Sequence, residues 1–245
     1  MTWRFWRKRR PSGSAPSPEP QRHEYRETWT ALSDTYPRAL AHVIGDLSED
    51  ELRASGLSTL ALLESTVGVH AGDTILEIGC GVGRVGWALA PRCATWIGCD
   101  VSARMLDFAR ERLAGRGRVE LVEISGFDLS PVPAESVDLV YCVSVFMHLD
   151  EWDRYSYICE AHRVLRPGGR IFVDNFNLLS EEGWQIFDAH RRAFPRARPA
   201  HISKASTPQE LEAYLVRAGF SGIEMQPLGP WIRLYATKSA GKDDV

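Results

Sequence analysis

The sequence lacks the features that would place it in a membrane or in an oxidising compartment. No apolar run approaches the length of a membrane span. The basic residues near the start are not followed by the apolar stretch of a signal peptide. The five cysteines are an odd number, with no C-x-x-C pair and no Cys/His cluster at zinc spacing. We therefore expect reduced thiols and a cytoplasmic location.

The sequence also lacks a strong excess of charge of either sign. Its 245 residues carry a formal net charge of −3, and 44% of them are hydrophobic and 25% charged. This is ordinary usage for a globular protein with one sizeable α/β core, and it gives no global attraction to nucleic acid. The charge is uneven, because five basic residues among the first ten leave 24 basic against 32 acidic side chains in the rest.

Composition divides the chain into three parts. Residues 1–22 combine a basic and aromatic start with a Pro/Ser-rich linker, and we expect a disordered arm. Trp3, Phe5 and Trp6 among the arginines would suit an anionic surface, although a solvated tail is the simpler interpretation. Residues 23–70 predict two or three helices, interrupted at Pro37, the second of them over 57–67. Residues 71–240 form the main domain.

From residue 74 onward, apolar strands alternate with amphipathic helices. This order is typical of a parallel sheet with helices on both faces. After the first strand, further strands are predicted over 96–99, 119–124, 137–143, 170–174, 223–226 and 231–237, the last two as an antiparallel pair. Residues 178–206 are predicted to be an insert with a helix around 184–192.

A glycine-rich turn follows the first strand. Residues 75–89 read ILEIGCGVGRVGWAL, in which Glu77 ends the strand and Gly79, Gly81 and Gly83 follow at alternate positions. Glycine takes φ > 0 at little cost, and without a Cβ it lets a bulky ligand lie against bare backbone. The E-x-G-x-G-x-G spacing resembles the first motif of the class I S-adenosylmethionine-dependent methyltransferases.

A dinucleotide site is the rival interpretation of this turn. Residues 81–86 also fit G-x-G-x-x-G, and Asp100 follows at a suitable distance. However, counting the pattern from Gly79, the first glycine after the strand, puts Arg84 where the third glycine should stand. We therefore favour the methyltransferase, keeping an NAD-dependent oxidoreductase and a purely structural turn as alternatives.

Two later segments extend the resemblance. VDLVYCVSVFMHLDEWDRY (137–155) resembles the family's fourth motif and its sequel, and HRVLRPGGRIFV (162–173) resembles the run into its fifth strand. The family implies an α/β fold: a doubly wound, mostly parallel seven-stranded sheet with an antiparallel last strand, here with added N-terminal helices. It also implies methyl transfer by in-line displacement from S-adenosyl-L-methionine to an O, N or C nucleophile.

The acceptor is expected to be a small molecule. The chain lacks the Asn/Asp-Pro-Pro-Tyr/Phe signature of amino-nitrogen DNA methylases after the fourth strand, so no nucleic-acid partner is expected. We expect the N-terminal helices to cover the cofactor, with Trp29 and Tyr36 as candidates. The insert would read the acceptor, and its arginines suggest an anionic or sugar-like one, although a solvated helix face is the simpler interpretation.

The resemblance implies a cofactor site at the carboxyl ends of the strands. Asp100 is expected to bind the ribose, unless it only caps the next helix. The loop with Gly126, Phe127 and Asp128 is expected at the adenine, and Val143 and Ser144 near the methionine end. The full predicted cofactor-binding set is Trp29, Glu77, Gly79, Gly81, Gly83, Arg84, Asp100, Val101, Met105, Gly126, Phe127, Asp128, Val143 and Ser144.

Two residues are predicted to be catalytic. His148 is a candidate general base because imidazole titrates near neutral pH; a loop-ordering role is the alternative. Asp174 precedes Asn175, a pair that binds a divalent cation in catechol-methylating relatives. Here Val143 or Ser144 stands where the third metal ligand should be, so no metal is expected and Asp174 is predicted to orient the substrate. A cofactor-binding protein without catalysis is the third hypothesis.

Overall fold

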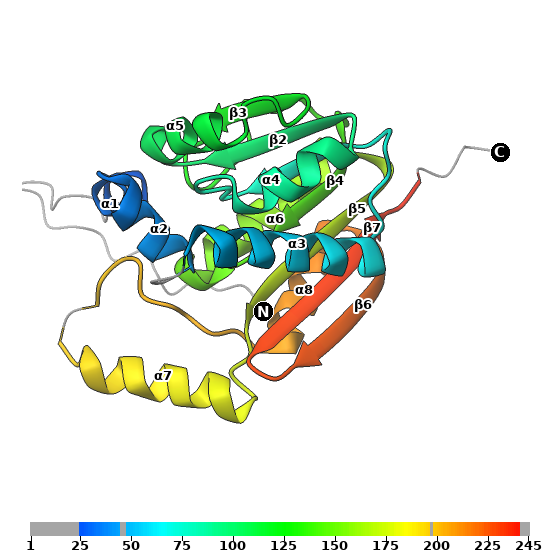
Figure 1. The fold of residues 1–245 in the computed structure, drawn as a ribbon. Coiled ribbons are helices and arrows are strands. Elements are labelled where there is room, and N and C mark those ends of the chain that lie inside the picture. Colours follow the sequence, from blue (N-terminus) through cyan, green and yellow to red (C-terminus); the bar gives the residue numbers. More distant parts are fainter. Residues whose placement is uncertain (1–24, 45–47, 197, 241–245) are drawn as a thin grey trace, which may run out of the picture.

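Seven strands form one sheet through the middle of the molecule (Figure 1). The computed structural model describes residues 25–44, 48–196 and 198–240, so the predicted arm over 1–22 lies outside it. The strand order is β3-β2-β1-β4-β5-β7-β6, and only β7 runs antiparallel to its neighbours. This confirms the predicted sheet. The strands are β1 (Thr74–Ile78), β2 (Thr95–Asp100), β3 (Val119–Glu123), β4 (Val137–Cys142), β5 (Leu165–Phe176), β6 (Phe220–Leu228) and β7 (Trp231–Lys238).

Helices cover both faces of this sheet. One face packs against α3, α4 and α5, and the other against α6 and α8. The helices are α1 (Tyr25–Leu32), α2 (Tyr36–Ile44), α3 (Glu49–Thr66), α4 (Arg84–Leu89), α5 (Ala103–Arg112), α6 (Glu151–Val164), α7 (Glu181–Ala193) and α8 (Pro208–Ala218). Within the described part of the chain, no helix combines the length and apolarity needed to cross a bilayer.

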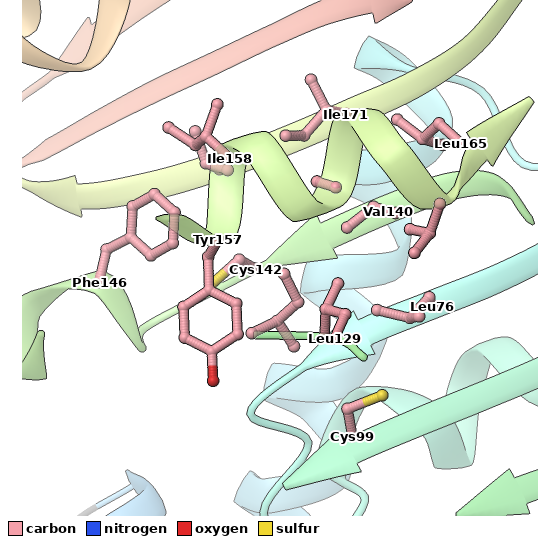
Figure 2. Close-up of a cluster of buried hydrophobic side chains, with 14 of the residues drawn as sticks. Leu76, Cys99, Leu129, Val140, Cys142, Phe146, Tyr157, Ile158, Leu165 and Ile171 are labelled. Atoms are coloured by element: carbon pink, nitrogen blue, oxygen red, sulfur yellow. The ribbon is translucent and has the colours of Figure 1, made fainter. Parts of the chain in front are cut away.

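The core on the α6 face is shown in Figure 2. Ile158 of α6 and Leu165, the first residue of β5, belong to the same buried cluster as Ile171 and Val140 of the strands, and all four are fully buried. Tyr157 comes from α6, next to Ile158. Its ring belongs to the core, whereas its hydroxyl points away from the other labelled side chains. Tyr157 therefore marks the place where the core borders the cavity described below.

The N-terminal helices differ in their bounds from the prediction. The first ends at Leu32, and the Ser33 hydroxyl that follows donates to the Trp29 carbonyl at 2.7 Å. Pro37 does not interrupt a helix, since it lies in the first turn of α2, where no amide donor is needed. The third helix begins eight residues before the predicted 57, at the capping box of Ser48 and Glu51. That signal is present in the sequence and was missed.

The strands at the far side of the sheet are longer than predicted. β5 starts at Leu165 and includes the Pro-Gly-Gly segment, which was predicted to be a turn before the strand. A register shift against β4 between Val137 and Leu139 absorbs this segment, and Gly168 takes φ +79° there. Both final strands also extend further, because β7 pairs along β5 and β6 over most of its length.

The packing of Trp96 gives a first prediction. Its indole is fully buried and lies over Gly98, where an added Cβ would overlap the ring. We expect Gly98→Ala to lower the free energy of unfolding by about 1–3 kcal/mol through overpacking, measured by chemical denaturation. Gly72→Ala is the matched control, because Gly72 is exposed and a Cβ there meets no atom within 4 Å. Equal stability of the two variants would contradict this packing.

Candidate functional site

A partly enclosed cavity opens at the carboxyl ends of the central strands. Its floor is the loop after β1, the end of β2 and the loops after β3 and β4, and helices α1 and α2 cover it. The side chains from these two helices are Tyr25, Trp29, His42 and Val43. This is the strand edge at which open α/β sheets bind their ligands.

The glycine loop presents bare backbone to the cavity. Gly79 and Gly81 take φ +72° and +52°, and both line the wall. A Cβ on Gly79 would overlap the side chain of Val145 from the loop after β4. A Cβ on Gly81 would lie 3.1 Å from Val43 of α2, on the opposite side. The space between loop and helix therefore exists only because these positions are glycine.

Asp100 ties this loop to the second strand. Its buried carboxylate accepts the Gly81 amide through Oδ2 and the Ser102 amide through Oδ1, both at 2.9 Å. Burial raises its pKa to about 6. Ser102, rather than Asp100, caps α5, since its hydroxyl accepts the Met105 amide at 3.3 Å. Each carboxylate oxygen can accept a second hydrogen bond, so Asp100 remains able to bind ligand hydroxyls.

Glu77 lies at the other side of the loop in a buried hydrogen-bond chain. The Trp96 indole donates to the Tyr141 hydroxyl at 3.0 Å, and this hydroxyl donates to Glu77 Oε2 at 2.5 Å. Burial raises the pKa of Glu77 to about 8, against the opposing effects of Tyr141 and the nearby Arg84 guanidinium. Arg84 itself donates to Thr59 of α3 at 3.0 Å, so it both lines the cavity and ties α4 to α3.

His148 lies at the end of the cavity beneath Trp29. The two rings meet edge to face with centroids 4.8 Å apart. The His148 Nδ1 atom is 2.8 Å from the His201 carbonyl, which only accepts hydrogen bonds, so Nδ1 carries the proton and Nε2 keeps its lone pair. Burial lowers the pKa of His148 to about 4, so the expectation that this group titrates near neutral pH is wrong, and the imidazole is neutral at pH 7.

Asp174 supports the loop after β4 from below. Its Oδ1 accepts the amide of Ser144 at 2.7 Å, and burial raises the pKa of Asp174 to about 7. Ser144 takes φ +61°, a conformation that costs a non-glycine residue energy and is typical of functional sites. Asp174 therefore holds a strained residue of the cavity wall but does not line the cavity itself.

Helix α1 is fastened across the cavity at three places. The Asp150 amide donates to the Tyr25 hydroxyl at 3.1 Å. The Arg26 guanidinium donates to the Ile124 carbonyl at 3.1 Å and pairs with Glu123 at 2.9 Å. At the end of the helix, the Ser33 and Ser102 hydroxyls are 3.0 Å apart. The helix is thus bound to the same loops that form the cavity floor.

The structure brings together most of the predicted site residues. Those on the cavity wall are Trp29, Glu77, Gly79, Gly81, Arg84, Asp100, Val101, Met105, Gly126, Val143, Ser144 and His148. Gly83 instead packs against Leu113 and Ala109 of α5. Phe127 and Asp128 lie outside the wall, with both amides donating to the Ser125 hydroxyl. Of the three loop residues expected at the adenine, only Gly126 therefore lines the cavity.

Sequence reasoning missed several wall residues. Tyr25 and Tyr157 line the cavity, as do His42 and Val43. Tyr25 lies one helical turn before Trp29, which is a signal that could have found it. His42 and Val43 follow Pro37 in a helix whose direction the sequence does not define, so no signal pointed to them.

Comparison with known proteins matches part of the chain to a known family. Residues 76–173 match the family model described as a methyltransferase domain. A ubiquinone biosynthesis O-methyltransferase from Sinorhizobium medicae is 33% identical over 166 residues, which cover 64% of this chain and 65% of the relative. A 27-O-demethylrifamycin SV methyltransferase from Amycolatopsis mediterranei is 28% identical over 200 residues, covering 78% and 71%.

Residues 76–173 form a methyltransferase domain. A solved S-adenosylmethionine-dependent methyltransferase from Thermotoga maritima, described as a possible histamine N-methyltransferase, shares the fold of this chain with a TM-score of 0.62. It is 20% identical, and the match covers 87% of this chain and 99% of that one. The resemblance to class I S-adenosylmethionine-dependent methyltransferases is thereby confirmed. The chain spans about half the length of two curated relatives that it matches, 46% of each.

The cavity of the methyltransferase domain fits the family's cofactor, S-adenosylmethionine. The glycine loop leaves a space that a Cβ would fill, and the buried Asp100 carboxylate borders it with acceptor capacity for ribose hydroxyls. Met105 and Val101 add apolar wall on the same side. We expect these residues to hold the nucleoside, and Gly79 and Gly81 to face the rest of the cofactor.

The three buried carboxyl groups of the methyltransferase domain give a pH prediction. Burial raises the pKa of Glu77, Asp100 and Asp174 in the folded state. At a pH between its unfolded and its folded pKa, each group therefore carries a proton in the folded state but not in the unfolded state. Stability from this source is therefore present at low pH and is lost as pH rises toward 8. Glu77→Gln removes one of these titrating groups. The free energy of unfolding should then fall less steeply between pH 5 and 7, by about 1.4 kcal/mol per pH unit.

The measurement is urea denaturation of the ligand-free protein across that pH range. Glu120→Gln, on the surface of β3, is the matched control and should keep the parent's slope. Parallel slopes for Glu77→Gln and the parent would show that Glu77 is ionised in the folded protein.

Proposed function

We propose that this chain transfers the methyl group of S-adenosylmethionine to a hydroxyl oxygen of a small molecule. When bound, the cofactor supplies an electrophilic methyl group, which is the demanding part of the chemistry. The protein then has to bind both partners, hold the acceptor in line with the methyl group and keep water out. The cavity beneath α1 and α2 is built for those tasks.

The observation that carries this proposal is the state of His148. Its Nδ1 proton is held by the His201 carbonyl, which leaves the Nε2 lone pair as the free acceptor of a neutral ring on the cavity wall. A neutral imidazole can take the proton of an acceptor hydroxyl as the new bond to carbon forms. An acceptor without a proton to lose would not need this group, so a hydroxyl fits better than an enolate carbon.

The relatives support the same class of acceptor. One is named for an O-methylation in ubiquinone biosynthesis, and another for a methylation of 27-O-demethylrifamycin SV, which is a small organic molecule. The cavity end near His148 is walled by Trp29, Leu149 and Val145, which suits an apolar or aromatic body around the hydroxyl.

The two alternative functions have less support. An NAD-dependent oxidoreductase would require a glycine where Arg84 stands, and Arg84 is committed to the α3 helix through Thr59. A cofactor-binding protein without catalysis has no need of a histidine held in one tautomer at the cavity end. Cofactor binding and methyl transfer are therefore tested separately.

Cofactor binding is tested by calorimetric titration with S-adenosylhomocysteine, with NAD as the parallel ligand. We expect binding of the former alone. Asp100→Ala should weaken it by about 1–3 kcal/mol, because a charge-assisted bond to the ribose is lost. Asp107→Asn, on the exposed side of α5, is the control and should bind like the parent. Unweakened binding by Asp100→Ala would refute the ribose assignment, and binding of NAD alone would overturn the proposed function.

The role of His148 is tested by His148→Gln with a labelled methyl donor and a panel of phenols and alcohols. We expect kcat to fall by about 10²–10⁴-fold, with the affinity for S-adenosylhomocysteine unchanged. Because the pKa of His148 is lowered to about 4, the parent's rate should show no titration of this group between pH 6 and 8. His70→Gln, at an exposed position, should behave like the parent. Full activity of His148→Gln would leave His148 as a loop-ordering residue.

A further inference from the structure

Helix α7 stands apart from the rest of the molecule. It follows the end of β5, and residues 198–206 lead on from it toward α8 (Figure 1). Its first turn is fixed, because Ser180 accepts the Gly183 amide at 2.9 Å and Gly183 lies so close to the Asn177 carbonyl that a Cβ would overlap it. The His190 ring also lies 3.3 Å from the Ser203 carbonyl. The helix therefore has a defined orientation.

This orientation leaves an aromatic pair facing solvent. Trp184 and Phe187, three residues apart, are 51% and 40% exposed, with ring centroids 5.4 Å apart. Leu179, just before the helix, is 64% exposed. These three are half of the large apolar side chains that are exposed in the described residues. Neighbouring apolar side chains on a helix that the core does not use mark an interaction surface.

The chain after the aromatic pair is basic. Arg191 and Arg192 are exposed and share one carboxylate, that of Asp188, at 2.7 and 3.1 Å. Arg196 and Arg198 are also exposed, and no described acidic side chain forms an ion pair with either. The two acidic residues of α7 besides Asp188 lie in its first turn. Positive charge thus gathers at the end of the helix, next to the aromatic surface.

We propose that the surface formed by the exposed side chains of Leu179, Trp184, Phe187, Arg191, Arg192, Arg196 and Arg198 docks onto an anionic phospholipid bilayer. Tryptophan and phenylalanine partition into the boundary between headgroups and acyl chains, while neighbouring arginines bind lipid phosphates. A second copy of this chain is the alternative occupant, and the test below distinguishes it from a bilayer. The proposal does not depend on methyl transfer.

A second basic and aromatic segment in the sequence would add to this attraction. Residues 3–10 read WRFWRKRR, with three aromatic and five basic side chains. Stable attachment to a membrane surface generally needs two such signals. His201, three residues after Arg198, holds His148 through its carbonyl. An acceptor dissolved in the lipid would therefore meet the protein beside the cavity end where His148 lies.

The test is flotation of the full chain with vesicles of phosphatidylcholine mixed with phosphatidylglycerol, and with vesicles of phosphatidylcholine alone. We expect binding to the mixed vesicles and weaker binding to the neutral ones. Trp184→Ser with Phe187→Ser, and separately Arg196→Gln with Arg198→Gln, should each reduce binding by about tenfold or more. Leu57→Ser with Val216→Ser, which removes two exposed apolar side chains elsewhere, should bind like the parent.

Thermal unfolding of every variant checks that the fold is retained. Failure of the parent to bind the mixed vesicles would overturn the proposal. So would unchanged binding of both α7 variants, including the case in which Gln at the basic positions of residues 4–10 alone abolishes it. A parent dimer that Trp184→Ser with Phe187→Ser converts to a monomer, without vesicle binding, would assign the surface to self-association instead.

Discussion

The site depends on the Asp100 carboxylate and the two amides that it accepts. Gly81 belongs to the loop after β1, and Ser102 begins the helix after β2, so one buried side chain fixes both loops relative to each other. The Ser102 hydroxyl extends this link to Ser33, at the end of α1. Asp100 therefore contributes to one of the three places at which the floor and the cover of the cavity are joined. Its burial costs desolvation energy, which the two amide hydrogen bonds offset in part.

The same balance recurs at the other acidic groups of the site. Glu77 relies on Tyr141, and Asp174 relies on the Ser144 amide, yet burial dominates in both and raises their pKa values. Such groups are expensive for a fold, and perturbed carboxyl groups gather where a site needs fixed dipoles and a shaped backbone. Here Asp100 holds the glycine loop and Asp174 holds the strained Ser144, while the cavity wall itself is mostly apolar.

Local signals in the sequence were enough to predict the sheet and the floor of the cavity. The glycine spacing and the residue ending each strand place Gly79, Gly81 and Asp100 at one edge, because parallel strands end together. The cover of the cavity is different. His42 reaches the wall only through the packing of α2, a tertiary contact with no local pattern. Asp174 was expected to orient the substrate, but its carboxylate accepts the Ser144 amide and does not line the cavity. The sequence does not show that the loop after β4 folds back onto it.

The anchoring of α1 has a kinetic consequence. Tyr25, Arg26 and Ser33 each bond to a different part of the cavity rim, so the helix cannot swing away by breaking one contact. A molecule of cofactor size enclosed beneath it exchanges with solvent only when these bonds open together. Opening of this kind is slower than side-chain motion and limits turnover in many enzymes. We therefore expect a bound ligand of this size to leave slowly, because α1 must first release all three contacts.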